Sequence, residues 1–205
     1  MKIDMGASTF QLALPSFPIA GRSVLDIGCS TGETLMHPYY SAAVRRCGMD
    51  VDRQAIENGR HEFPDLELQV ADAEHLPYSA EEFDVVISKV ALLYTDIRKS
   101  FAEIFRVMKP GGDVFLTMHD LRLQWIFFSR AVKAAALRRV IDHGYIVGAS
   151  AIYIATGRIP ARPWSGTRET FQSVNSLRRD LTLAGFVNQE FQRTARDFIV
   201  SAHKP

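Results

Sequence analysis

The sequence predicts an α/β fold: a doubly wound, mostly parallel sheet with an antiparallel final hairpin and a helical cap insertion. Short apolar, β-rich runs alternate with helix-like segments through the first 118 residues, as crossover connections between parallel strands require. The tail then ends in two short alternating runs, which are typical of a hairpin. A chain of 205 residues, 47% of them hydrophobic, can bury one large core, so we expect a single domain spanning residues 1–205.

The first half of the chain supplies the predicted strands and two crossover helices. The strands are expected at Val24–Ile27, Val44–Val51, Leu66–Val70, Phe83–Ser88 and Val114–Met118. Asp52 is placed to cap a helix over Arg53–Arg60, and the apolar spacing within Asp96–Met108 predicts a second helix. The run Pro110-Gly111-Gly112 should stop that helix and turn the chain into the fifth strand.

The chain changes character after Asp120. Residues 121–166 form a long apolar and basic stretch that we interpret as a substrate-cap insertion. An amphipathic helix over Phe171–Ala184, ended by Gly185, and a hairpin of Phe186–Phe191 with Asp197–Ala202 should complete the sheet.

Composition excludes several classes of function. A net charge of +1 provides no large phosphate-binding surface, so nucleic acid is not the expected partner. Cys29 and Cys47 cannot form a multi-bridge framework, which favours a reduced, cytoplasmic compartment. Residues 1–10 lack the pattern of a signal peptide, and no run of about 18 apolar residues predicts a membrane span.

A small-residue turn follows the first strand. The run from Gly28 to Gly32 lies at the carboxyl end of a parallel strand, where a ligand can approach the backbone and its amides can meet polar groups. Glycines that merely form a tight turn are the structural alternative. A nicotinamide-binding fingerprint would need a third glycine, and Glu33 follows Gly32 instead.

Carboxylates follow the next two strands. Asp50 closes the second strand, where doubly wound folds place an acidic residue that accepts hydrogen bonds from ribose hydroxyls. Asp52 competes for this role, but capping the next helix is its plainer role. Asp72 follows the third strand and could accept from an adenine amino group, although solvated loop carboxylates are as common.

Together these segments resemble the class I S-adenosylmethionine-dependent methyltransferases, in particular the small-molecule group that includes ubiquinone-biosynthesis-like enzymes. The resemblance is strong from Ser23 to Met118 and weak in the tail. It rests on Val24-Leu25-Asp26-Ile27-Gly28-Cys29-Ser30-Thr31-Gly32, Gly48-Met49-Asp50-Val51, Ala71-Asp72-Ala73 with Leu76-Pro77, Phe83-Asp84-Val85-Val86-Ile87-Ser88 and Arg106-Val107-Met108-Lys109-Pro110-Gly111-Gly112.

The resemblance implies a Rossmann-like seven-stranded sheet and S-adenosylmethionine as cofactor, with S-adenosylhomocysteine as product. It assigns the methionine part to Asp26 and the turn residues Gly28, Cys29, Ser30 and Gly32, the ribose to Asp50, one adenine face to Val51, and the adenine edge to Asp72 and Ala73. Ser88, at the end of the fourth strand, joins the predicted cofactor site. Two departures stand out: Ser30 replaces the middle glycine, and Pro38 predicts a short or bent first helix.

Methyl transfer is an in-line displacement, so positioning the acceptor supplies most of the catalysis and no catalytic residue is obligatory. Tyr94 and His119 are candidate bases near the ends of the fourth and fifth strands, and each also has an ordinary structural explanation. No cluster of histidines, cysteines or carboxylates has metal-ligand spacing, so we expect no metal.

The apolar, basic stretch Leu121–Ile141 has three interpretations: a lid over a hydrophobic or acidic acceptor, a helix in peripheral contact with a membrane, or an ordinary packed helix. A small, hydrophobic or aromatic acceptor is the expected substrate. The alternative to an enzyme is a non-catalytic S-adenosylmethionine-binding partner subunit or regulatory protein. The sequence does not choose the acceptor atom or the oligomeric state.

Overall fold

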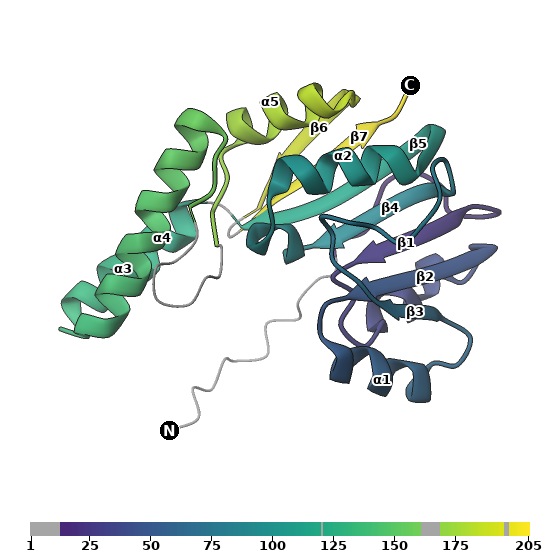
Figure 1. The fold of residues 1–205 in the computed structure, drawn as a ribbon, viewed down its shortest axis with the longest axis horizontal. Coiled ribbons are helices and arrows are strands. Elements are labelled where there is room, and N and C mark those ends of the chain that lie inside the picture. The colour runs from purple at the N-terminus through teal and green to yellow at the C-terminus, as the bar shows by residue number, and fades with distance from the viewer. Residues whose placement is uncertain (1–12, 120, 161–168, 195–196) are drawn as a thin grey trace.

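The computed structural model describes residues 13–119, 121–160, 169–194 and 197–205. A seven-stranded sheet of order β3-β2-β1-β4-β5-β7-β6 forms its centre (Figure 1). The strands are β1 Ser23–Ile27, β2 Arg45–Asp50, β3 Glu67–Val70, β4 Phe83–Lys89, β5 Met108–His119, β6 Val187–Arg193 and β7 Asp197–His203. Strands β1 to β5 pair in parallel, and β7 runs antiparallel to both β5 and β6. The predicted doubly wound sheet with a closing hairpin is confirmed.

The helices lie between the strands in the predicted order. They are α1 Arg53–Glu62, α2 Ile97–Val107, α3 Leu121–Lys133, α4 Leu137–Thr156 and α5 Val174–Ala184, with short 3-10 helices η1 Glu33–Met36, η2 Pro38–Tyr40 and η3 Ala91–Tyr94. Asp52 caps α1 as predicted, because its carboxylate accepts from the amides of Gln54 and Ala55. Gly185, with φ of 105°, ends α5 as predicted.

The segment after β1 departs further from a regular helix than the sequence predicts. Instead of one short or bent α-helix, two 3-10 helices, η1 and η2, meet at His37. His37 has ψ of 138°, the extended conformation that a residue before proline adopts, and Pro38 starts η2. Leu35 and Tyr40 still reach the core, so the segment covers the sheet without an α-helix.

The expected stop and turn at Pro110-Gly111-Gly112 takes the form of an irregularity inside β5. Helix α2 ends at Val107, and Met108 already pairs with Phe83 of β4 before the register shifts to Val85 opposite Asp113. Gly111 adopts φ of 79° within this detour. Regular pairing of β5 therefore begins next to the predicted strand, at Asp113.

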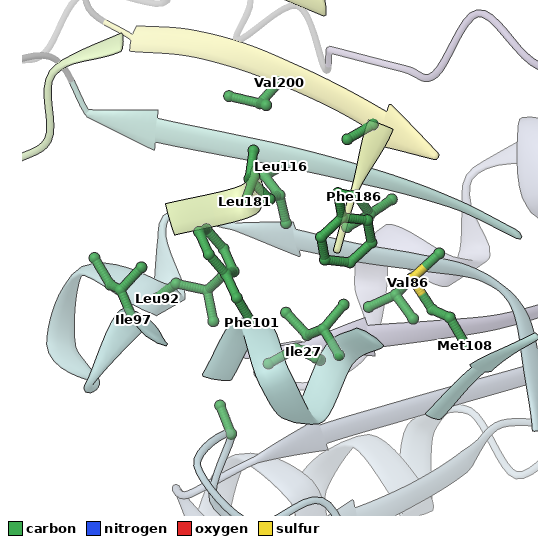
Figure 2. Packing of buried hydrophobic residues seen from close by; sticks show 14 of the residues in the cluster. Ile27, Val86, Leu92, Ile97, Phe101, Met108, Leu116, Leu181, Phe186 and Val200 are labelled. Atoms are coloured by element: carbon green, nitrogen blue, oxygen red, sulfur yellow. The ribbon is translucent and has the colours of Figure 1, made fainter. Parts of the chain in front are cut away.

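Two clusters of buried side chains cover opposite faces of the sheet. On one face, α2 and α5 pack on alternate residues of β4, β5 and β7; Figure 2 shows Phe101 and Leu181 beside Leu116 and Val200. On the other face, Ile56 of α1, with Leu35 and Tyr40, packs on β1 and β4. Side chains that alternate along each strand therefore fix which residues face which layer.

Helices α3 and α4 occupy most of the predicted cap and pack side by side at one end of the molecule (Figure 1). A hydrogen bond of 2.8 Å joins Gln124 Nε2 of α3 to His143 Nδ1 of α4. The end of the predicted cap, residues 161–166, lies outside the described residues, as does the amino-terminal segment for which we expected no signal peptide. None of the helices in the described ranges is long and apolar enough to cross a bilayer.

Candidate cofactor and acceptor site

Asp26 is a buried carboxylate without a hydrogen-bond partner. It lies in β1 two residues before Gly28, is 1% exposed, and neither carboxylate oxygen receives a hydrogen bond. Burial raises the pKa of Asp26 from its usual 3.8 to about 7; the charge of Lys89 opposes this rise, and Asp50 adds to it. Buried carboxylates are normally paired, so an unpartnered one at the carboxyl edge of a sheet points to a cationic ligand group.

The glycine turn after β1 allows close packing but offers few free donors. The amides of Gly28 and Cys29 both donate to the carbonyl of Met49, at 2.8 and 3.0 Å, and the amide of Gly32 donates to Cys29. These three amides already donate to β2 and to the turn itself, so they are not free donors in this structure, and the assignment of the turn to the cofactor stays a prediction. Ser30, which replaces the usual glycine, adopts φ of 53°.

Asp50 joins the glycine turn to the end of β2. Its Oδ2 accepts from the amide of Ser30 at 2.9 Å, and its Oδ1 accepts from the amide of Asp52 at 2.9 Å. These bonds fix the carboxylate at the edge of the sheet and leave lone pairs that can accept from hydroxyl groups. Asp52 uses its own carboxylate to cap α1, as predicted, so Asp50 is the better placed of the two for a ribose.

The loops after β2 and β3 lie side by side. The amide of Ala71 donates to the carbonyl of Asp50 at 3.0 Å, which brings the Asp72 loop to the end of β2. Asp72 is exposed and accepts from the amide of Glu74 at 2.9 Å, whereas Ala73 is buried. Val51 is 70% exposed and provides an apolar face between these carboxylates.

Ser88 contributes a structural hydrogen bond rather than a free donor. Its buried hydroxyl donates to the carbonyl of Ile27 at 2.9 Å and so ties β4 to β1. Two residues later, Val90 adopts φ of 63°, a strained conformation for a β-branched residue, and its amide donates to Thr117. The chain then enters η3, whose Ala91 side chain leaves no room for a Cβ at Gly28: the distance would be 2.1 Å.

The two candidate bases lie in different surroundings. Tyr94 ends η3 and is 57% exposed, whereas Nδ1 of His119 forms a hydrogen bond with Asp197 of β7. The His119 ring also stacks on Phe171, with ring centroids 5.9 Å apart. Asp197 thus orients the imidazole, as acid–base catalysis requires, but the same contacts would hold a purely structural histidine.

A cavity of about 640 Å³ is lined by the end of β4, by residues along β5, β6 and β7, and by residues 13, 14 and 16. Its lining combines apolar side chains such as Phe115 and Ile199 with polar ones such as Lys89, Thr117 and Asp197. The Thr117 hydroxyl is buried and has no hydrogen-bond partner. This volume and mixed lining fit a small organic molecule.

No group of three or more potential metal ligands occurs among the residues that the structure describes.

Comparison with known proteins finds a family match over the segment that contains this sheet edge. The family described as methyltransferase domain matches residues 25–116, which carry Asp26, the glycine turn, Asp50 and Asp72. Residues 25–116 thus carry a methyltransferase domain.

Similar proteins share this domain. An uncharacterized methyltransferase, YodH, of Bacillus subtilis is 35% identical over 102 residues, covering 46% of this chain and 42% of that protein. Phthiotriol/phenolphthiotriol dimycocerosates methyltransferase 1 of Mycobacterium ulcerans is 33% identical over 113 residues, covering 51% and 39%. Demethylmenaquinone methyltransferase of Renibacterium salmoninarum is 33% identical over 95 residues, covering 46% and 40%. The methyltransferase domain thus matches about two fifths of the length of these relatives.

Solved structures extend the likeness of the fold beyond the matched domain. A S-adenosylmethionine-dependent methyltransferase from Mesorhizobium loti superposes with a TM-score of 0.63 and 17% identity, over 92% of this chain and 93% of that one. The methyltransferase domain and its fold imply S-adenosylmethionine as cofactor. The residues present suit that group: Asp26 is an unpartnered anion for its ammonium, and Val51 is an exposed apolar surface for its adenine.

One residue at this methyltransferase edge escaped the sequence analysis. Lys89 ends β4 beside the cofactor edge and also lines the cavity. A lysine that closes an otherwise buried strand was the available signal, because strand ends at the carboxyl edge point to the site.

Proposed function

We propose that this protein transfers a methyl group from S-adenosylmethionine to a small hydrophobic or aromatic acceptor by in-line displacement. The observation that carries the proposal is the unpartnered carboxylate of Asp26 beside the fixed carboxylate of Asp50 at one edge of the sheet. The matched relatives are named for phthiotriol-type and demethylmenaquinone acceptors, which supports a lipophilic small molecule.

In this proposal the cofactor contacts come from residues at the ends of successive strands. Asp26 binds the ammonium group, Asp50 accepts from the ribose hydroxyls, Val51 packs on the adenine face, and Asp72 and Ala73 border the adenine edge. Gly28 and the rest of the glycine turn, Cys29, Ser30 and Gly32, allow close approach of the methionine part, and Ser88 holds β1 against β4 beneath it. S-adenosylmethionine supplies an electrophilic methyl group when bound.

The acceptor is proposed to occupy the cavity beside the cofactor edge. Tyr94 of η3 and His119, which Asp197 of the cavity lining orients, are the proposed bases that remove a proton from a hydroxyl or acidic carbon acceptor. Apolar lining residues position the acceptor and exclude water, which supplies most of the rate enhancement in a displacement of this kind.

Residues 121–166 act as the substrate cap in this proposal, within one domain spanning residues 1–205. Trp125, Ile126, Leu137 and Ile141 on α3 and α4 are all about half exposed or more. Several arginine and lysine side chains are exposed along the same two helices. This combination suits peripheral contact with an anionic lipid surface from which a lipophilic acceptor is taken. Sedimentation of the protein with lipid vesicles tests this contact. Binding to anionic vesicles but not to neutral ones supports it, and binding to neither kind refutes it.

Methyl transfer is tested with radiolabelled S-adenosylmethionine and a panel of quinols, phenols and hydroxylated lipids. Wild-type protein should label at least one acceptor, and Asp50→Ala should lose most of that activity at low cofactor concentration. A protein that binds the cofactor but labels nothing in the panel would favour the alternative, a non-catalytic partner subunit or regulatory protein.

A further inference from the structure

Lys89 and Asp26 project from the same face of the sheet at its carboxyl edge. In the parallel pairing of β1 with β4, Asp26 lies opposite Ile87 and Ile27 lies opposite Ser88. Lys89 is two residues beyond Ile87, so its side chain extends on the face that Asp26 occupies, level with the start of the glycine turn. A cation and an anion therefore flank the first glycine of the turn.

Neither charge is satisfied by the other. Both oxygens of Asp26 lack a hydrogen bond, and Lys89 is half-buried and belongs to no ion pair within 4 Å in the described part of the chain. Burial lowers the pKa of Lys89, and the charges of Asp26 and Glu33 partly restore it. The two groups thus influence each other electrostatically while leaving space between them.

Four of the five amides in the turn are already engaged in hydrogen bonds within the protein. The amides of Gly28, Cys29 and Gly32 donate to backbone carbonyls, and the amide of Ser30 donates to Asp50. A ligand carboxylate in this region therefore meets few free amides, and Lys89 is a cation placed to bind it. Three donor hydrogens on a flexible stem suit a group of this kind.

We propose that Asp26 and Lys89 together bind the zwitterion of an α-amino acid group, with the ammonium at Asp26 and the carboxylate at Lys89. This inference rests on the proposed function, in which that group is the methionine end of the cofactor. Lys89 is a cofactor-binding and specificity-determining residue, and it lies between the cofactor edge and the acceptor cavity. If Lys89 contacted only an acceptor in the cavity, replacing it would leave the affinity for the cofactor unchanged.

Calorimetric titration of cofactor-free protein tests this with two ligands that differ only in the carboxylate. These are S-adenosylhomocysteine and 5′-deoxy-5′-(3-aminopropylthio)adenosine, which keeps the ammonium. Wild-type protein should prefer S-adenosylhomocysteine by about tenfold or more, the usual size of a charge-assisted hydrogen bond. Lys89→Met should abolish that preference by weakening S-adenosylhomocysteine alone, and Lys89→Arg should retain it.

Lys109→Met is the matched control, because Lys109 is a half-buried lysine at the start of β5, near the opposite end of β4, where it pairs with Asp84. It should leave both affinities unchanged. Equal weakening of both ligands in Lys89→Met, or no weakening, would overturn the assignment of Lys89 while the proposed function stands. No binding of S-adenosylhomocysteine by wild-type protein would overturn both.

Discussion

Replacing Asp26 with asparagine should make the cofactor-free protein more stable at pH 8 and a weaker binder of its cofactor. The wild-type carboxylate is fully buried, unpartnered, and has its pKa raised from 3.8 to about 7, chiefly by burial. Because a tenfold change in proton affinity corresponds to about 1.4 kcal/mol, the ionised group costs the folded state about 4 kcal/mol at pH 8. Asparagine carries no charge, but burying its unpartnered amide costs part of this free energy, so we expect a net stabilisation of about 2 kcal/mol.

The raised pKa of Asp26 determines how the stability difference between the two proteins changes with pH. A carboxyl with a raised pKa binds its proton more tightly in the folded protein than in the unfolded chain. The stability that the neutral form contributes is therefore present below the unfolded value of 3.8 and is lost as the pH rises to about 7. The stability of Asp26→Asn relative to wild type should rise by about 4 kcal/mol between pH 4 and pH 8.

Urea unfolding followed by circular dichroism at several pH values measures this difference. Asp65→Asn, an isosteric change at an exposed site, should show no comparable trend. A difference between wild type and Asp26→Asn that stays constant with pH, or an asparagine variant less stable than wild type at pH 8, would refute the reasoning. The same variant should bind S-adenosylhomocysteine at least tenfold more weakly, since its ammonium loses an anionic partner.

Three further predictions concern packing, a buried ion cluster and catalysis. Gly59→Ala should destabilise the protein by about 2 kcal/mol or more, because a Cβ there would lie 2.2 Å from the Thr31 carbonyl. Gly148→Ala should instead stabilise α4 by about 0.5–1 kcal/mol, because no atom lies within 4 Å of the added Cβ; thermal melts measure both effects. Asp180→Ala should cost about 3 kcal/mol in urea unfolding, because the fully buried Asp180 carboxylate accepts from two arginines and a tyrosine; a loss below about 1 kcal/mol would contradict this. His119→Gln should lower kcat roughly 100-fold with unchanged S-adenosylhomocysteine affinity, and an unchanged kcat would leave this histidine with a structural role only.

The fold was predictable wherever a local pattern decided it. Alternating apolar runs located the strands, and Asp52 and Gly185 marked helix ends through side-chain capping and positive φ. The segment around Pro38 was predictable only in part: a proline announces a break, but whether a bent α-helix or two 3-10 helices result depends on how Leu35 and the neighbouring residues reach the core.

The sequence predicted that the candidate site residues gather at one edge of the sheet, as the structure places them, but it did not predict their hydrogen bonds. Asp26, Asp50 and Asp72 all follow or close strands that end at one edge, which the strand order makes neighbours. Whether a turn amide is free depends on tertiary distances, such as that from Gly28 to the Met49 carbonyl, which no local pattern encodes. The lysine at the end of the fourth strand was a local signal for Lys89, but its relation to Asp26 appears only once β1 pairs with β4.

The most direct test of this account is a crystal structure of the protein with S-adenosylhomocysteine. We predict the amino acid end of the ligand beside Asp26, the ribose hydroxyls on the Asp50 carboxylate, and the adenine between Val51 and the Asp72 loop. A ligand bound at another edge of the sheet, or one that leaves Asp26 and Asp50 without contact, would contradict it.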